Sequence, residues 1–262
     1  MPDSLGDRMK AYENISRIYL TKRLPVIIRI DGRAFHTLTR GFDRPFDTVF
    51  SRSMWDTAAE LCKEIGGAKL AYTQSDEISI LLTNDDNLET QPWFDNNLQK
   101  LVSVAASTAT KEFNNIFDWY WINNDPDGEL RLAYSRASGE ATFDARAFVL
   151  PHDEVCNYFI WRQQDAVRNS IQMAAQSVYS HKELQGKNQN DLQEMLFQKG
   201  INWNNYGPWH KRGVCVIKKF AEEQATGEEQ ARLHWVVDMN IPIFTQDRGY
   251  IENALKGNQN DT

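Results

Sequence analysis

The fold is decided by two stretches of sequence, Pro25-Val-Ile-Ile-Arg-Ile-Asp31-Gly32-Arg33-Ala-Phe35-His36 and Leu70-Ala-Tyr-Thr-Gln-Ser75-Asp76-Glu77-Ile-Ser-Ile-Leu-Leu82. The first is an apolar run that ends in a carboxylate and a glycine, which predicts a strand over residues 26–31. The second has two apolar runs around a polar tip, which predicts a hairpin over residues 69–82. A strand end and a neighbouring hairpin that each carry an aspartate favour a two-metal phosphoryl-transfer site, whose ions hold the attacking and leaving oxygens.

The segments around these stretches predict an α+β fold. Asp47 is a plausible N-cap for a helix, and residues 120–140 are polar and read as an excursion from the core. The order of elements fits an antiparallel or mixed sheet with helices on one face, the ferredoxin-like split-βαβ arrangement. The expected helices cover residues 8–22, about 48–65, 98–116 and 153–180, and a further strand covers residues 141–150.

The part of the chain after Gly186 is more polar. It predicts a short helix over residues 191–199, a loop rich in Asn and Trp, and a hairpin that pairs residues 213–220 with 233–239. We expect residues 1–150 to form the catalytic core with both acidic segments. Residues 151–262 are expected to pack on this core, so that the whole chain is one structural domain.

Composition narrows the class of protein. The chain has 262 residues, of which 41% are hydrophobic and 25% charged, as in an ordinary globular protein. Three cysteines without metal-ligand spacing argue against a zinc site or a disulfide framework. The N-terminus has no signal pattern and no window reaches the length of a membrane span, so we expect a cytoplasmic protein without a membrane partner. The net charge of −7 argues mildly against nucleic acid, although local basic clusters still allow it.

Asp31 and Asp76 are the candidate metal ligands, because Mg²⁺ prefers carboxylate oxygens and needs few protein ligands. Gly32 lets backbone groups approach a phosphate closely, and the amides of residues 33–36 are placed to line a triphosphate. Glu77 follows Asp76 and points to the other face of a strand, so it is expected to support the ligands rather than bind the ions. A single carboxylate at a turn commonly caps local amides, and only the pair favours a metal site.

Other polar residues allow two interpretations. Arg44 lies in a loop from which it can reach a phosphate, and Lys100 lies off the apolar stripe of its helix, facing either solvent or a cleft. The polar stretch Trp161–Ser170 is either an RNA-binding surface or an exposed helix in which Asp165 pairs with arginines. The loop over residues 200–213 is either a nucleotide-contact surface or a packed irregular loop.

These motifs together resemble the tRNA(His) guanylyltransferase family, which adds nucleotides to RNA 5′ ends in the 3′–5′ direction. The matching pieces run in the family's order and span roughly residues 8–220. They are Arg29-Ile-Asp31-Gly32-Arg33-Ala-Phe35-His36, Gln74-Ser75-Asp76-Glu77-Ile-Ser, Phe143-Asp144-Ala-Arg146, Trp161-Arg162-Gln163-Gln164-Asp165, and Asn202-Trp-Asn204 leading to Lys211-Arg212-Gly213.

The resemblance implies a palm-like core, two Mg²⁺ ions, tRNA, ATP and GTP as substrates, and a homotetramer. It implies that Asp31, Asp76 and the Gly32 carbonyl hold the ions, and that His36, Arg44 and Lys100 act in substrate activation or phosphate contact. The nucleotide-binding residues would be Asp31, Gly32, Arg33, Ala34, Phe35, His36, Arg44, Ser75 and Asp76. The RNA-binding residues would be Arg162, Arg168, Asn169, Asn202, Lys211 and Arg212.

The sequence also departs from the eukaryotic members. Val167-Arg168-Asn169-Ser170 stands where those members have His-Ile-Asn-Asn, and Arg44 and Phe46 replace a lysine and an asparagine. The departures favour the guanylyltransferase-like branch, which repairs tRNA 5′ ends by copying the opposite strand. The alternatives are addition of one guanosine to tRNA(His), a palm-fold nucleotide cyclase, a metal-dependent nuclease, and a non-catalytic RNA-binding protein.

Overall fold

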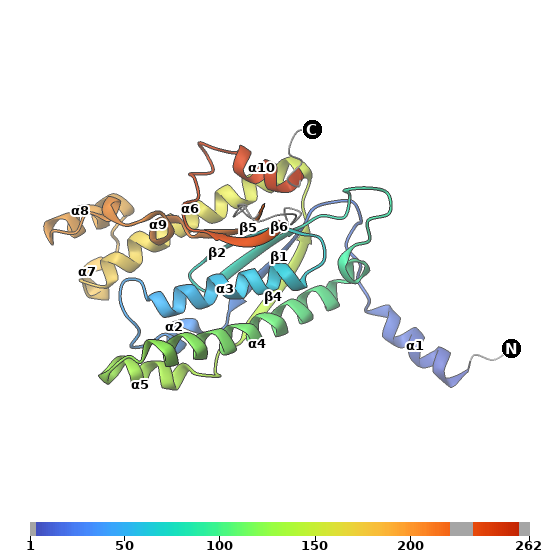
Figure 1. Ribbon diagram of the computed structural model, residues 1–262, viewed down its shortest axis with the longest axis horizontal. Coiled ribbons are helices and arrows are strands. Elements are labelled where there is room, and N and C mark those ends of the chain that lie inside the picture. The colour runs from blue at the N-terminus through green and yellow to red at the C-terminus, as the bar shows by residue number, and fades with distance from the viewer. Residues whose placement is uncertain (1–3, 221–232, 257–262) are drawn as a thin grey trace, which may run out of the picture.

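A computed structural model describes residues 4–220 and 233–256. Its centre is a six-stranded sheet, which Figure 1 shows between the helices. Every neighbouring pair of strands is antiparallel, and the order is β4-β1-β3-β2-β5-β6. The strands are β1 Val26–Gly32, β2 Ala68–Gln74, β3 Glu77–Leu82, β4 Phe143–Val149, β5 Val214–Phe220 and β6 Leu233–Asp238.

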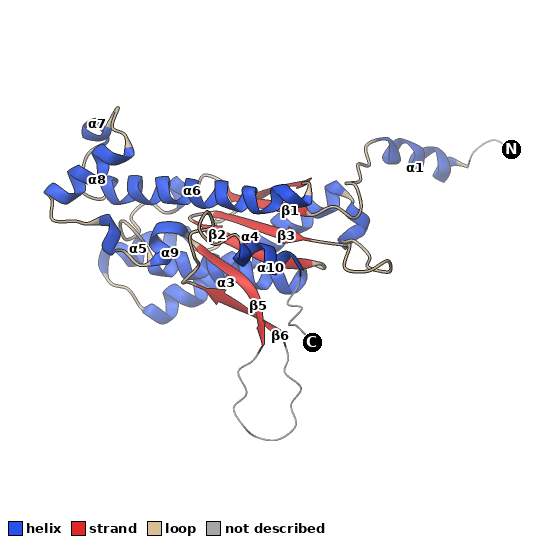
Figure 2. Ribbon diagram, turned by 90° about the horizontal axis from the view of Figure 1, so that it is seen from above, coloured by secondary structure: helices blue, strands red, loops and turns tan. Residues whose placement is uncertain are grey.

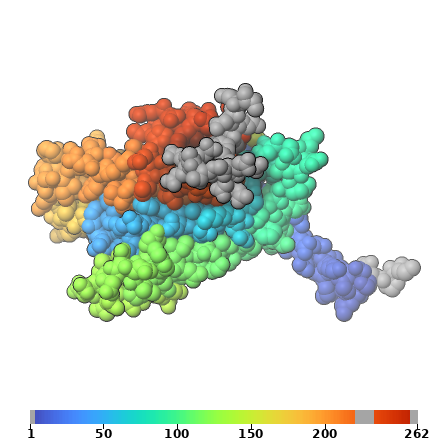
Figure 3. Space-filling model, in the orientation of Figure 1, coloured from blue at the N-terminus to red at the C-terminus, as the bar shows by residue number. Residues whose placement is uncertain are grey.

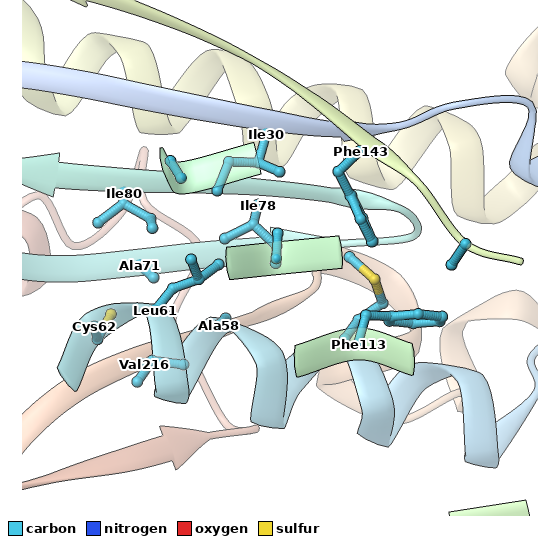
Figure 4. Close-up of a cluster of buried hydrophobic side chains, with 14 of the residues drawn as sticks. Ile30, Ala58, Leu61, Cys62, Ala71, Ile78, Ile80, Phe113, Phe143 and Val216 are labelled. Atoms are coloured by element: carbon cyan, nitrogen blue, oxygen red, sulfur yellow. The ribbon is translucent and has the colours of Figure 1, made fainter. Parts of the chain in front are cut away.

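The first four strands form a split-βαβ unit, which confirms the predicted α+β class. Helix α3 (Thr48–Glu64) connects β1 to β2, and α4 (Leu98–Asn124) connects β3 to β4. Asp47 caps α3 by accepting a hydrogen bond from the amide of Phe50, as its position before an apolar stripe predicts. Both helices pack on one face of the sheet, where Figure 4 shows Leu61 and Phe113 against Ile30 and Ile78.

The opposite face of the sheet is also covered, which the expectation of helices on one face did not include. Helix α6 (His152–Gln176) lies along this face, as Figure 2 shows, and α10 (Gly249–Lys256) packs beside it. Phe159 of α6 and Ile251 of α10 are buried with Ile27 and Leu81 of the sheet. The run Val26–Ile30 is apolar at nearly every position because β1 is buried on both faces.

The remaining elements refine the prediction. Residues 120–140 are not a polar excursion: α4 continues to Asn124 and a further helix, α5, follows it. The predicted C-terminal hairpin is confirmed by the antiparallel pairing of β5 with β6, while the loop between them lies outside the described residues. The other helices are α1 Leu5–Ile15, α2 Phe35–Leu38, η1 Trp93–Asn96, α5 Gly128–Ala137, α7 His181–Leu184, α8 Gln189–Gln198, η2 Trp203–Asn205 and α9 Pro208–Arg212.

The second half of the chain joins the same sheet as the first half. Strand β5 pairs with β2, so that Tyr72 lies opposite Cys215.

Within residues 4–220 and 233–256, no helix has both the length and the apolar character that crossing a bilayer requires.

Candidate active site

The two candidate aspartates meet at one end of the sheet. Strands β1 and β3 are antiparallel with Asp31 opposite Glu77, and the amide of Gly32 donates to the carbonyl oxygen of Asp76 at 3.0 Å. This pairing places the turn between β2 and β3 beside the end of β1. Burial raises the pKa of the Asp76 carboxyl above its ordinary value, and repulsion from the Asp31 carboxylate raises it further.

A cavity of about 430 Å³ opens at this end of the sheet. Its size falls in the range of about 300–1,000 Å³ that is typical of small-molecule sites. Seven of the predicted site residues line it. They are Gly32, Ala34, Phe35, His36, Arg44, Ser75 and Asp76.

The backbone is strained at two places on the wall of this cavity. The backbone of Ala34 (φ 55°) and of Ser75 (φ 51°) adopts the left-handed conformation, which residues other than glycine and asparagine rarely take. Ser75 belongs to the tight turn that presents Asp76, and Ala34 precedes α2. Such strain persists where the surrounding structure imposes a geometry that function needs.

Gly32 is required for a reason other than the predicted close approach of a phosphate. A Cβ atom at this position would lie 2.4 Å from the ring of Phe35, which packs under the end of β1. The amide of Arg33 donates to the carbonyl of Thr142 at 2.9 Å and is therefore not free to line a triphosphate. The amides of residues 34–36 lie just before or at the start of α2. Amides in this position have no hydrogen-bond acceptor within the helix, so the predicted contact with a triphosphate remains open to them.

Helix α6 contributes cavity residues that the sequence analysis missed. Its C-terminal end extends past the sheet, so that Met173 and Gln176 line the cavity opposite the β2–β3 turn. Helical periodicity shows that these residues lie on a helix, but nothing in the local pattern indicates that its end reaches the aspartates.

Glu77 pairs with two arginines, of which Arg29 also approaches Asp31, and its supporting role stays a prediction. Its carboxylate accepts two hydrogen bonds from Arg162, at 2.7 and 2.6 Å, and lies 2.6 Å from the guanidinium of Arg29. Arg29 and Arg146 also place guanidinium nitrogens 3.9 and 3.7 Å from the Asp31 carboxylate. These cations partly neutralise the acidic end of the sheet.

The prediction that Arg162 contacts RNA does not agree with its position. Arg162 is only 4% exposed, because α6 packs its guanidinium against the sheet. Besides Glu77, the guanidinium donates to Asp165 at 3.0 Å. Asp165 also accepts from the half-exposed Arg168 at 2.5 Å, so the intrahelical pairs of the alternative interpretation are present.

Lys100 is not brought to the cavity within this chain. The hydroxyl of Thr110 accepts from the amide of Phe143, which lies opposite Gly32 in the sheet. Lys100 precedes Thr110 by ten residues, which is about 15 Å along the helix axis. Figure 1 places the start of α4 near α1, at the end of the molecule away from α2.

The other predicted RNA-binding residues divide into two groups. Arg168 and Asn169 are exposed on α6. The residues of the Asn/Trp loop are instead bonded within the molecule: the Asn202 side chain accepts from the amide of Asn204, the Lys211 ammonium donates to the carbonyl of Asn204, and the Arg212 guanidinium donates to the carbonyl of Ile241. These bonds favour the packed-loop interpretation, and RNA contact by this group stays a prediction.

The donor set at the sheet end fits a divalent cation that shares its ligands with a substrate. In the described part of the chain, no three His, Cys, Asp or Glu side chains cluster as a metal site. Mg²⁺ is commonly held by one or two carboxylates together with substrate phosphates, which is what Asp31, Asp76 and the Gly32 carbonyl offer. The raised pKa of Asp76 beside Asp31 also shows concentrated negative charge that a cation would relieve.

Comparison with known proteins agrees with this geometry. A family model described as tRNAHis guanylyltransferase matches residues 6–151, a span that contains both acidic segments. The chain belongs to the tRNA(His) guanylyltransferase family. The guanylyltransferases of this family are nucleotidyltransferases, and the enzyme described here is one of them.

Individual members of the tRNA(His) guanylyltransferase family match over nearly the whole chain. A bacterial tRNA(His) guanylyltransferase-like protein in complex with ATP is 49% identical, with a TM-score of 0.84 over 96% of this chain and 98% of that one. A structure of such a protein with GTP is 48% identical, with a TM-score of 0.78 over 97% and 99% of the two chains. A probable tRNA(His) guanylyltransferase of Dictyostelium discoideum is 28% identical over 94% of this chain and 95% of its own.

Proposed function

We propose that this enzyme adds nucleotides to the 5′ end of tRNA in the 3′–5′ direction, in a Mg²⁺-dependent reaction that begins with activation of the 5′ phosphate by ATP or GTP. The observation that carries the proposal is that Asp76 lines a nucleotide-sized cavity, while Asp31 lies at the neighbouring strand end, next to the cavity residue Gly32. The ATP and GTP complexes of the bacterial relatives support it.

The first stage of the proposed reaction activates the RNA. An oxygen of the 5′-monophosphate attacks the α-phosphorus of ATP, a new phosphoanhydride forms, and pyrophosphate leaves. His36 and Arg44 line the cavity, which supports a role for both in holding the phosphates of the nucleotide. An RNA that already carries a 5′-triphosphate bypasses this stage.

The second stage extends the RNA. The 3′-hydroxyl of an incoming nucleotide attacks the activated 5′ phosphorus, a phosphodiester bond forms, and the activating group leaves. This group is AMP or GMP after activation by ATP or GTP, and pyrophosphate when the RNA carries a 5′-triphosphate. Transfers of this kind need positioning and neutralisation of charge rather than a covalent nucleophile. Two Mg²⁺ ions, held by Asp31, Asp76 and the Gly32 carbonyl, would neutralise charge on the attacking and leaving oxygens. The walls of the cavity keep the two substrates in register.

We propose template-dependent repair as the biological form of the reaction, because Val167–Ser170 lacks the eukaryotic His-Ile-Asn-Asn run. The names of the relatives favour the second candidate, addition of one guanosine to tRNA(His). The two are separated with 5′-truncated tRNA transcripts in which the opposing base is varied, each incubated with one labelled nucleotide. Repair predicts that the incorporated nucleotide follows the opposing base.

The matched control is a tRNA(His) transcript of normal length. Incorporation of guanosine into this RNA alone, whatever the opposing base, would overturn the repair proposal in favour of the second candidate. A product formed from ATP or GTP in the absence of RNA would instead indicate a cyclase.

We also propose that copies of the chain associate, as the homotetramer implied by the family resemblance requires. Figure 3 shows α1 standing clear of the rest of the described chain. Its apolar residues repeat at helical spacing along one face, yet they remain 65%, 51%, 70% and 82% exposed. They are Leu5, Met9, Tyr12 and Ile15. An apolar face of this size on a projecting helix indicates a surface that another copy covers.

Replacing Leu5, Met9 and Tyr12 by serine is therefore expected to shift the enzyme from its assembly to smaller species. Light scattering behind size exclusion, at micromolar protein, measures the change. The control replaces Lys10, Glu13 and Asn14 of the same helix, which lie away from the apolar face, by serine and is expected to keep the assembly. A wild-type protein that is monomeric in this measurement would contradict the proposal.

The cysteines suit the proposed cytoplasmic location. Cys62, Cys156 and Cys215 are all buried and unpaired. Buried free thiols are typical of proteins in a reducing compartment.

A further inference from the structure

A second cavity lies behind the wall of the catalytic cavity. It measures about 430 Å³ and is lined by Arg33, Arg40 and Arg136, with Glu140 at its edge. Ala34 lines both cavities, so the segment that begins α2 separates them. This second cavity is called the arginine pocket below. It is lined by the side chain of Arg33, a residue that the family resemblance predicts to bind the nucleotide.

The three guanidinium groups of the arginine pocket carry charge that the described protein does not neutralise. Within residues 4–220 and 233–256, no ion pair involves Arg33, Arg40 or Arg136, and the lining carries one carboxylate, that of Glu140. All three arginines are exposed. Their gathering is notable in a chain whose net charge is −7, because their mutual repulsion is otherwise unfavourable.

One of the three arginines, Arg136, is held in place by contacts with backbone carbonyls. The guanidinium of Arg136, on α5, donates to the carbonyl of Arg40 at 3.4 Å and to that of Leu132 at 3.3 Å. Helix α5 itself is fixed to the core by Tyr134, whose hydroxyl donates to the buried Asp47 carboxylate at 2.7 Å. The core therefore fixes α5, and through α5 it fixes Arg136 beside the backbone of Arg40.

The lining of the arginine pocket favours the phosphates of a nucleic-acid backbone over those of a free nucleotide. A nucleotide site normally offers an aromatic or broad apolar surface to the base, whereas none of the residues lining this pocket is aromatic. Guanidinium groups bind phosphate oxygens in a bidentate way and are the usual contact for a nucleic-acid backbone. Because the two cavities share the wall at Ala34, the arginine pocket lies within reach of an RNA whose 5′ end occupies the catalytic cavity.

We infer that the arginine pocket binds backbone phosphates of the RNA substrate near its 5′ end, through Arg33, Arg40 and Arg136. The inference rests on the proposed function, since it places the RNA relative to the catalytic cavity. Contacts of this kind set the register of the RNA and act on its affinity, independently of the base sequence.

The test compares the double variant Arg40→Gln/Arg136→Gln with the wild type in binding a 5′-monophosphorylated tRNA transcript by fluorescence anisotropy. We expect the Kd to rise about tenfold at low salt and the dependence of log Kd on log salt to become shallower by about 1.5, because two phosphate contacts are removed. The KM for RNA should rise with little change in kcat, and binding of ATP alone, measured by calorimetry, should stay within twofold. The control is Arg131→Gln, since Arg131 lies on α5 but pairs with Asp125.

A second variant excludes misfolding as the cause. Glu140→Gln removes the carboxylate of the pocket and should lower the Kd for RNA about two- to threefold, a gain that damage to the fold does not produce. Unchanged RNA affinity in both variants, or loss of ATP binding alone in the double variant, would overturn the inference and leave the proposed function standing. A wild-type enzyme that neither binds nor extends RNA would overturn the proposed function instead.

Discussion

Replacing Asp76 by asparagine is expected to lower the rate of nucleotide addition at least about a thousandfold, because it removes a charge that acts only in the phosphoryl-transfer step. Asparagine keeps the size of the side chain and the β2–β3 turn, so the fold should remain. Burial and the Asp31 carboxylate already raise the pKa of Asp76, and the neutral residue removes this repulsion. Single-turnover incorporation of a labelled nucleotide into a truncated tRNA measures the rate, and anisotropy shows that RNA still binds.

Asp31→Asn is expected to have the same effect, and the double variant should be little slower than either single variant. Residues that act as one unit lose their joint function when the first member is removed. The matched control is Asp86→Asn, since Asp86 forms an exposed ion pair with Lys69 and lies outside the cavity lining. A double variant that still extends RNA at the wild-type rate would contradict the assignment of both aspartates.

The parts of the site that lie at strand ends and turns could be predicted, because short patterns of apolar and polar residues identify those positions. The end of β1 and the β2–β3 turn follow from apolar runs that stop at a carboxylate, and hairpin pairing brings Asp76 to the strand that neighbours β1. These relations depend on contacts between neighbouring segments of the sheet. The split-βαβ order and the N-cap at Asp47 were predictable for the same reason.

The rest of the site depends on how distant elements pack, which periodicity does not show. The pattern of α6 identifies a helix with a wide polar face, but not that this face meets the sheet at Glu77. Lys100 lies off its apolar stripe, as predicted, yet the direction of α4 places it far from the cavity. The polar composition of residues 120–140 does not predict α5, so nothing in the sequence indicates that Arg136 lies beside Arg33 and Arg40.

The burial of Arg162 leads to the second large effect. Replacing Arg162 by methionine is expected to destabilise the protein by about 3–5 kcal/mol, because it leaves the Glu77 carboxylate inside the protein with one cation fewer. Burial lowers the pKa of Arg162, but the carboxylates of Glu77 and Asp165 raise it more, so the arginine stays charged. At about 2–4 °C per kcal/mol for a chain of this size, the midpoint of thermal unfolding should fall by about 6 °C or more.

Arg168→Met is the matched control, because Arg168 pairs with the same Asp165 from the same helix. The side chain of Arg168 is 50% exposed whereas that of Arg162 is 5% exposed. An exposed ion pair contributes about 0–1 kcal/mol, so this variant should unfold within about 3 °C of the wild type. Equal unfolding midpoints for the two variants would show that the buried contact with Glu77 stabilises the protein no more than an exposed ion pair does.

Two further measurements separate support of the fold from contact with RNA. Combining Arg162→Met with Glu77→Gln removes the buried carboxylate that has lost one of its two cations, so the double variant should lose at least about 1 kcal/mol less than the sum of the single losses. At a temperature well below both midpoints, Arg162→Met should bind tRNA within about twofold of the wild type, because a direct phosphate contact would be worth more than that. A tenfold loss of RNA affinity in a fully folded Arg162→Met protein would instead show that Arg162 contacts RNA despite its burial.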